Sequence, residues 1–205
     1  SNPGQAIVVG DDGYVNWDST TGFLTGFGSA QPDVGGNDVI DVGNGTNVVV
    51  GGNGGDTITT GSGADIILGD NAAVTYNPGT ANLLQAISTD LSNTTGGDDI
   101  VNAGDGDNLI IGGVGVDAIT TGTGADLVLG DNGQIDWTTG GVLGQVQTSD
   151  PTLGAGDVIL NSLSYHLVPA GYLFDGSFTR LGATVIPAGT GPTELQLQMA
   201  RDLNA

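Results

Sequence analysis

Acidic or amide side chains recur every nine residues along two stretches of this chain, residues 33–71 and 94–132. Glycines surround each of them. A carboxylate next to backbone carbonyls that glycine leaves free to turn provides the oxygen ligands that a hard cation such as Ca2+ requires. The residues at these places are Asp38, Asn47, Asp56 and Asp65 in the first stretch and Asp99, Asn108, Asp117 and Asp126 in the second. The pattern therefore predicts a series of Ca2+ sites.

The nine-residue units share one template, in which position 4 is glycine, position 6 is the acidic or amide residue and position 8 is aliphatic, and in which positions 1 and 2 are also glycine in the most complete units. Residues 51–59 (GGNGGDTIT) match every fixed position of G-G-x-G-x-D-x-U-x, where U is a large aliphatic residue. This template is typical of calcium-binding parallel β-helix repeats. Position 8 is occupied by Ile40, Val49, Ile58, Ile67, Val101, Ile110, Ile119 and Val128. We expect these aliphatic side chains to fill a narrow core.

The units resemble the glycine- and aspartate-rich nonapeptide repeats of RTX (repeats-in-toxin) proteins, which bacteria secrete. The resemblance is close over residues 33–71 and 94–132 and weaker over residues 1–32, 72–93 and 133–160. It implies an all-β fold, a parallel β-roll or β-helix solenoid, in which each unit forms a turn followed by a short strand. Successive strands would alternate between two parallel sheets, and Ca2+ would lie between turns stacked on the same edge.

If units two apart stack in this way, the position-6 residues form pairs. The predicted pairs are Asp38 with Asp56, Asn47 with Asp65, Asp99 with Asp117, and Asn108 with Asp126. We expect the pairs that contain Asn to hold Ca2+ more weakly, because they carry one charge fewer. Further candidate ligands outside the two sets of four are Asp70, Asp131 and Asp157.

Two alternatives to Ca2+ sites remain open. Turns rich in Gly, Asn and Asp also occur in calcium-free solenoids, where side-chain amides and hydroxyls satisfy the backbone. Another ion could also bind, but Mg2+ demands a tight octahedron and Zn2+ prefers His or Cys. Zn2+ is disfavoured further because the chain has one His and no Cys.

The charge balance is strongly acidic, with 23 Asp and Glu against two basic residues and a net charge of −21. Such a charge destabilises a compact state unless counter-ions bind, so we expect folding to be coupled to cation binding. Because the chain has no basic patch, nucleic acid and anionic membranes are disfavoured as partners. It also has no apolar run long enough for a transmembrane segment.

Calcium dependence points to a secreted or cell-surface protein, because weak sites of this kind suit the millimolar Ca2+ outside cells. The chain begins without Met or a signal peptide. We therefore expect a processed protein or a segment of a longer one.

A longer period of about sixty residues contains the nonapeptides. A phrase that begins Gly-Asp-Asp/Asn and continues into alternating apolar sequence starts at residues 10, 69 and 130, which are 59 and 61 residues apart. Each phrase leads into a turn, which predicts a hairpin-like insertion, and we expect an even number of strands per module. Trp17, Tyr76 and Trp137 lie in these insertions. A packed layer is favoured for these aromatic residues over a ligand site.

The second and fourth units of each run are apolar at all of positions 7 to 9, as in residues 48–50 (VVV) and 66–68 (IIL). If strands alternate between two sheets, one sheet has an apolar outer face. Such a face is rare on a monomer, so either the hairpins or another molecule must cover it.

Two segments follow from these patterns. Residues 1–160 are predicted to form the calcium-binding β-roll, and residues 161–205 a C-terminal cap with a short helix at about 192–203. His166 lies in the cap segment without a neighbouring nucleophile, so it is interpreted as structural.

The favoured function is a structural or adhesive module that folds and stiffens on Ca2+, as in bacterial adhesins and surface-layer proteins. No catalysis is expected, since the chain contains neither HExxH nor GxSxG. The alternative is a non-catalytic repeat domain of a larger secreted enzyme or toxin. Self-association into a filament, head-to-tail or through the apolar sheet face, is a further hypothesis.

Overall fold

Three β-sheets make up the part of the protein that the computed structural model describes, residues 4–90, 92–150 and 152–161. Two of the sheets are parallel and five-stranded, and the third is antiparallel and six-stranded. We call them the middle sheet, the outer sheet and the hairpin sheet. The described residues contain no helix.

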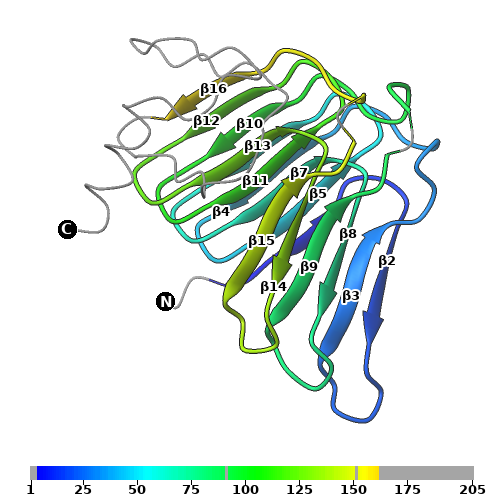
Figure 1. The fold of residues 1–205 in the computed structure, drawn as a ribbon, viewed down its shortest axis with the longest axis vertical. Helices are drawn as coiled ribbons and strands as arrows, with labels where there is room; N and C mark the ends of the chain where they lie inside the picture. The colour runs from blue at the N-terminus through cyan, green and yellow to red at the C-terminus, as the bar shows by residue number, and fades with distance from the viewer. Residues whose placement is uncertain (1–3, 91, 151, 162–205) are drawn as a thin grey trace.

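The middle and outer sheets are built from the nonapeptide strands, and the chain alternates between them (Figure 1). The middle sheet has the order β1 (Ile7–Val9), β5 (Val48–Gly52), β7 (Ile66–Asp70), β11 (Leu109–Gly113) and β13 (Leu127–Asp131). The outer sheet has the order β16 (Val158–Asn161), β12 (Ala118–Thr121), β10 (Ile100–Ala103), β6 (Thr57–Thr60) and β4 (Val39–Gly43). The alternation predicted from the repeats is therefore confirmed.

A narrow core lies between the two parallel sheets. Strands pair in register, so that Ile67 of β7 lies beside Val49 of β5 on one side and beside Ile110 of β11 on the other. All the position-8 residues of the two runs belong to one hydrophobic cluster, together with Ile159 of β16. These aliphatic side chains point inward, as predicted, because alternate residues of a strand face opposite sides of a sheet.

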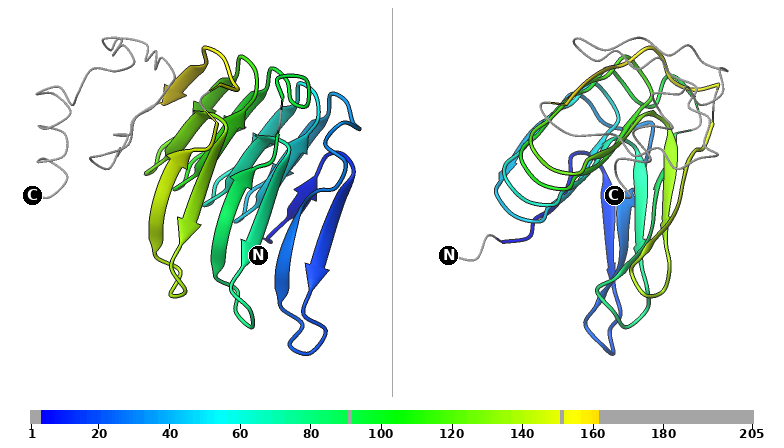
Figure 2. Two further views of the ribbon diagram at one scale, coloured as in Figure 1. Left: turned by 45° about the vertical axis from the view of Figure 1, so that its right-hand side comes forward. Right: turned by 60° about the vertical axis from the view of Figure 1, so that its left-hand side comes forward.

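The hairpin sheet consists of three hairpins that leave the coil at intervals of about sixty residues. Its order is β15 (Leu143–Thr148), β14 (Gly133–Trp137), β9 (Leu83–Ser88), β8 (Ala72–Tyr76), β3 (Leu24–Ser29) and β2 (Gly13–Trp17). The right-hand view of Figure 2 looks almost along the coil, and the hairpins project beyond it on one side. This sheet corrects the expectation of a single solenoid, since the hairpins pair with one another as a separate antiparallel layer.

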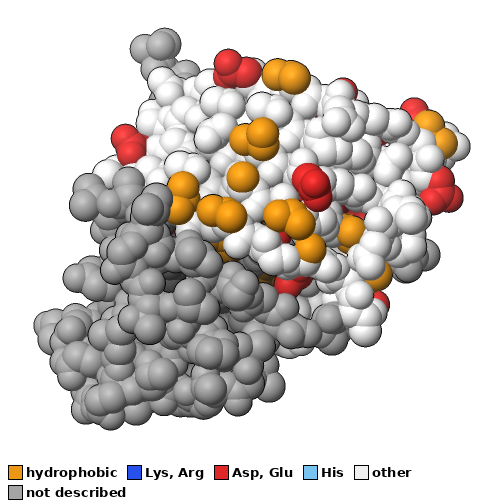
Figure 3. Space-filling view, turned by 90° about the horizontal axis from the view of Figure 1, so that it is seen from above, with side chains coloured by type: hydrophobic (Ala, Val, Ile, Leu, Met, Phe, Trp, Pro, Cys, Tyr) orange, Lys and Arg blue, Asp and Glu red, His pale blue; other side chains and the backbone are white. Residues whose placement is uncertain are grey.

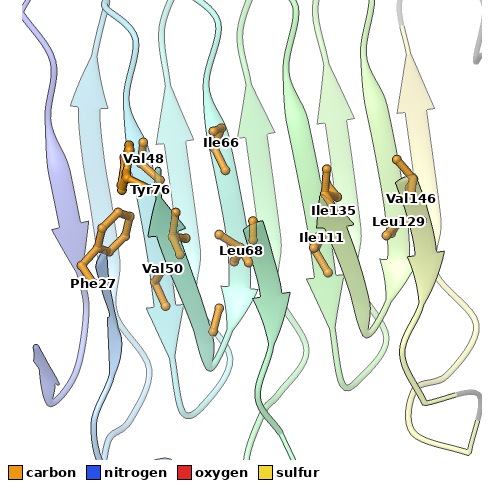
Figure 4. Packing of buried hydrophobic residues seen from close by; sticks show 13 residues of the cluster. Phe27, Val48, Val50, Ile66, Leu68, Tyr76, Ile111, Leu129, Ile135 and Val146 are labelled. Atoms are coloured by element: carbon orange, nitrogen blue, oxygen red, sulfur yellow. The ribbon is translucent and has the colours of Figure 1, made fainter. Parts of the chain in front are cut away.

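A second core fills the space between the middle sheet and the hairpin sheet (Figure 4). Val50, Leu68 and Leu129 of the middle sheet, at most 2% exposed, pack there with Phe27 and Ile135 of the hairpins. The apolar outer face noted in the sequence is thus covered within the chain. A parallel strand buried on both faces is a continuous apolar run, which accounts for the apolar second and fourth units.

The hairpins share one local design. Each has a register shift at its last paired residues, next to Trp17, Tyr76 or Trp137. Each loop also contains a glycine with a left-handed φ between 72° and 78°, a conformation that costs other residues free energy. The glycines are Gly22, Gly79 and Gly141.

The three aromatic residues of the hairpins differ in their surroundings. Tyr76 is buried, with its ring centroid 6.4 Å from that of Phe27, and Trp137 packs against the same core. Trp17 is 61% exposed. The predicted packed layer is therefore found for two of the three.

The coil contributes four strands and the hairpin two to the repeating module, so the expected even number is confirmed. Because the number of strands per module is even, the apolar strands of successive modules all lie in the middle sheet. The predicted cap, its helix and His166 lie outside the described residues, apart from Asn161, which ends β16. Among the described residues no helix is both long and apolar enough to cross a membrane.

Candidate metal sites at the sheet edges

The position-6 residues form two ladders, one at the start of each parallel sheet. Five aspartates precede the strands of the outer sheet and form what we call the aspartate ladder: Asp38, Asp56, Asp99, Asp117 and Asp157. The residues that precede the strands of the middle sheet form the mixed ladder: Asn47, Asp65, Asn108 and Asp126. Turns stack in this way because the strands of units two apart pair in register within one sheet.

Backbone hydrogen bonds connect the members of the aspartate ladder. The backbone N–H of Asp38 donates to Oδ1 of Asp56 at 2.8 Å, and that of Asp56 donates to Oδ1 of Asp99 at 2.7 Å. The ladder continues from Asp99 to Asp117 at 2.9 Å and from Asp117 to Asp157 at 3.0 Å. The predicted pairs are adjacent, and the Asp56–Asp99 and Asp117–Asp157 contacts extend the ladder across hairpins.

The mixed ladder uses the same bond. The backbone N–H groups of Asn47 and Asn108 donate to Oδ1 of Asp65 and Asp126, at 2.8 and 3.1 Å. The N–H of Asp65 donates to Oδ1 of Asn108 at 3.1 Å. Both predicted Asn–Asp pairs are therefore neighbours in the structure.

The second carboxylate oxygen of several ladder residues has no hydrogen-bond partner within the described residues. This holds for Oδ2 of Asp38, Asp56, Asp65, Asp99 and Asp117, each of which is shielded from solvent. A buried carboxylate oxygen without a partner is costly, unless a proton or a cation compensates it. These oxygens are therefore candidate cation ligands, four in the aspartate ladder and one, that of Asp65, in the mixed ladder.

A backbone carbonyl converges with the unpaired oxygen in front of a glycine at position 1. An ideal Cβ built on Gly51 would lie 2.3 Å from Oδ2 of Asp56 and 2.0 Å from the carbonyl oxygen of Gly69. A Cβ on Gly112 would lie 2.4 Å from Oδ2 of Asp117 and 2.2 Å from the carbonyl oxygen of Gly130. A Cβ on Gly10 or Gly69 would likewise lie against an aspartate Oδ2 and a glycine carbonyl oxygen. Glycine keeps these oxygen cradles open.

Backbone carbonyls must supply most ligands at such a site. Within the described residues no group of three or more His, Cys, Asp or Glu side chains converges on one point. Ca2+ accepts backbone carbonyls together with carboxylates at about 2.3–2.6 Å, whereas Zn2+ prefers nitrogen and sulfur. The donors present therefore fit Ca2+.

The carboxyls of the aspartate ladder are electrostatically unfavourable as anions. Burial raises the pKa of Asp56 to about 7, with a smaller contribution from the charges of Asp38 and Asp11. Burial likewise raises the pKa of Asp117 to about 8 and that of Asp99 to about 9, and neighbouring carboxylates add to both shifts. A bound divalent cation would stabilise the ionised forms of these groups.

Asp70 and Asp131, also predicted as ligands, lie at the bases of hairpins. Oδ1 of Asp70 accepts the N–H of Gly97 at 2.9 Å, and its Oδ2 accepts the N–H of Val114. Oδ1 of Asp131 accepts the N–H of Ala155 at 3.1 Å. These contacts give the two residues a backbone role, and the ligand role stays a prediction.

Sequence reasoning missed this role, which Asp11 shares at the first hairpin. Asp11 accepts the N–H of Gly36 at 3.2 Å and that of Asn53 at 2.6 Å. We call Asp11, Asp70 and Asp131 the hairpin clamps, because each bonds to the residue where the chain re-enters the coil. The signal that could have found them is the recurrence of an acidic residue at the same place in each module, directly before the alternating sequence of a hairpin.

Stacked glycine-rich turns with buried carboxylates and two parallel sheets define a calcium-binding repeat protein. The family model for the RTX calcium-binding nonapeptide repeat (4 copies) matches residues 35–49, 41–73 and 93–133. The chain therefore contains RTX calcium-binding nonapeptide repeats. The matched segments include every position-6 residue of both runs, and Asp157 lies beyond them. Comparison with the curated proteins and with the solved structures gave no match.

Proposed function

We propose that this protein is an extracellular calcium-binding module with a structural or adhesive role, in which Ca2+ folds and stiffens the coil as a β-roll. The single observation that carries the proposal is the series of buried, unpaired Oδ2 atoms along the ladders. Ca2+ would supply the positive charge that these oxygens lack, with Asp38, Asp56, Asp99, Asp117 and Asp157 as the principal holders.

The charge distribution supports a requirement for cations. Residues 1–161 contain 20 carboxylates and no basic side chain, because both arginines and the histidine lie in residues 162–205. The face in Figure 3 accordingly displays carboxylates, scattered hydrophobic side chains and no basic group among the described residues. Self-repulsion of this size favours an expanded chain where Ca2+ is scarce and a folded one outside the cell.

Self-association is proposed only in its head-to-tail form. The apolar face of the middle sheet is covered by the hairpins, which argues against lateral packing through it. Within the described residues, β4 and β13 each pair with a strand on one side only, and such edges can accept a strand from another copy. A role without catalysis and a place within a larger secreted protein are both compatible with this proposal.

Circular dichroism with parallel light scattering tests the proposal. Chelated protein is titrated with Ca2+ and, separately, with Mg2+. We expect a coil-to-β transition with Ca2+ alone, and growth of scattering would support assembly. A β spectrum already complete in chelator and unchanged by either ion would overturn the calcium-dependent fold.

A further inference from the structure

The side-chain amide of Asn47 is surrounded by oxygens. Its Nδ2 donates to the carbonyl oxygens of Gly43 and Gly45 at 3.2 and 3.3 Å and to Oδ1 of Asp65 at 3.0 Å. Asn47 is 1% exposed, so no solvent reaches this centre. One NH2 group thus holds two backbone carbonyls of its own turn and a carboxylate of the next.

Asn108 repeats the arrangement one module later. Its Nδ2 donates to the carbonyl oxygens of Gly104 and Gly106 at 3.1 and 3.2 Å and to Oδ1 of Asp126 at 3.0 Å. It is also 1% exposed. The recurrence of all three contacts, 61 residues along the chain, indicates a built feature.

An aspartate at the same position cannot make these contacts, because an ionised carboxylate has no donor. Asp65, the neighbour of both asparagines in the mixed ladder, keeps an unpaired Oδ2. The members of the aspartate ladder from Asp38 to Asp117 do the same. The NH2 groups of Asn47 and Asn108 therefore occupy the place at which these aspartates have an oxygen without a positively charged partner.

Position 1 of each turn varies together with position 6. It is Val42 and Ala103 in the two Asn turns, but Thr60 and Thr121 in the two Asp turns of the same ladder. The hydroxyls of Thr60 and Thr121 are buried and have no partner within the described residues. In the aspartate ladder a position-1 glycine provides the open cradle. Turns with the amide at position 6 thus have an apolar side chain at position 1, whereas turns with a carboxylate and no hairpin have either a hydroxyl or a glycine there.

We propose that the amides of Asn47 and Asn108 take the cation positions of their own turns, so that these two turns are closed without metal. Ca2+ then binds along the aspartate ladder and at the Asp65 turn. Amide hydrogen bonds therefore hold part of the turn edge of the middle sheet together without Ca2+. The turn edge of the outer sheet, which has only aspartates, requires Ca2+. This inference rests on the proposed function, because it distributes the Ca2+ of that proposal.

The test converts the amides into carboxylates. Asn47→Asp/Asn108→Asp is compared with wild type by native mass spectrometry and calorimetric titration with CaCl2. We expect two additional Ca2+ ions at saturation and a lower unfolding temperature in chelator, where the new carboxylates have no positive partner. Asn102→Asp is the control for the chemical change at each site, because Asn102 is exposed on the outer sheet and its substitution adds one negative charge, as each of the two substitutions does, without a surrounding cage of oxygens. It should add no ion.

The reciprocal variant Asp56→Asn should lose one Ca2+ ion and unfold at a higher temperature in chelator. A wild type that binds Ca2+, with a double variant that binds no more, overturns the assignment of the amides and leaves the proposed function standing. A wild type that binds no Ca2+ overturns both.

Discussion

At position 6 of each turn the side chain has two separable tasks. Its Oδ1 accepts the N–H of the preceding ladder member, and Asp and Asn do this equally well, as at Asp65 and Asn108. The second atom decides how the turn is neutralised, because Nδ2 of Asn108 donates to carbonyls whereas Oδ2 of residues such as Asp56 and Asp65 stays unpaired. The ladder geometry is therefore common to both residue types, and only the cation requirement differs.

The position-1 glycine offers a steric test of the cradle. Gly51→Ala should place a methyl group against Oδ2 of Asp56 and the carbonyl of Gly69, at distances that force one of them to move. The φ of Gly51 lies outside the left-handed region, so the effect is steric. We expect one Ca2+ ion fewer and a loss of about 1–3 kcal/mol in the free energy of unfolding with Ca2+.

Gly36→Ala is the control for this change, because a Cβ there meets no atom within 4 Å. It should keep the ion count of the wild type and alter stability by less than about 0.5 kcal/mol. Equal behaviour of the two variants would contradict the cradle.

At the scale of the element, the hairpins are insertions between positions 2 and 4 of a turn. The coil tolerates them because a clamp fixes the point of return, so that Asp56 still reaches Asp99 across the second hairpin. The clamp Asp70 is 2% exposed, and burial raises its pKa to about 10.

Asp70→Ala tests the clamp. It leaves the N–H groups of Gly97 and Val114 without their acceptor, and we expect unfolding to become easier by about 2–4 kcal/mol. Hydrogen exchange at these two amides should accelerate. Asp105→Ala is the control, because Asp105 accepts the N–H of Thr123 at an exposed position, where water can replace it. A clamp role leaves the number of bound Ca2+ ions unchanged, whereas loss of an ion would show that Asp70 is the ligand predicted from the sequence.

Burial of the middle sheet by the hairpin sheet can be tested by substitutions in the core between them. Leu68 is 2% exposed between the middle and hairpin sheets, and Leu68→Ala should cost about 2–5 kcal/mol in thermal or denaturant unfolding with Ca2+. Leu84 on β9 is 38% exposed, and Leu84→Ala should cost less than about 1 kcal/mol. Equal losses would mean that the hairpins do not bury the middle sheet.

At the scale of the whole molecule, the coil could be predicted well because its period is local. The nine-residue spacing, together with the resemblance to RTX repeats, predicts that Ile67 and Ile58 share one core and that Asp56 lies beside Asp38, and both are confirmed. The hairpin sheet was harder to predict. Its pairs between hairpins, such as Phe27 with Val74, are set by the rise of the coil, which no local pattern encodes.

The sequence predicted which residues line the site but not the different role that each of them has. Spacing places Asp70 at position 2 of its unit and Asp56 at position 6, but it does not show that both carboxylate oxygens of Asp70 accept backbone N–H groups while Oδ2 of Asp56 stays unpaired. Nor could spacing reveal the amide contacts of Asn47, which depend on where two carbonyls point. Both distinctions arise from three-dimensional hydrogen bonding.

The raised carboxyl pKa values predict how pH affects the metal-free protein. The ordinary carboxyl pKa is 3.8, and burial raises the pKa values of Asp56, Asp117 and Asp99 to about 7, 8 and 9. Between about pH 4 and pH 9 the folded chain therefore binds more protons than the unfolded chain, and stability falls as pH rises. The contribution is fully present below about pH 4 and is lost above about pH 9.

Ca2+ should reverse this dependence, because it binds the ionised carboxylates and displaces their protons. We expect the unfolding temperature of chelated protein to fall from about pH 5 to about pH 9, and that of Ca2+-saturated protein to rise from about pH 5 to about pH 7. General repulsion among surface carboxylates would also destabilise the chelated protein at high pH, so a second measurement separates the two causes. Calorimetry at about pH 7 in two buffers of different ionisation enthalpy should detect protons released on Ca2+ binding. Binding without proton release would mean that the ladder carboxyls are already ionised in the metal-free protein, and the pH dependence would then belong to the surface charge.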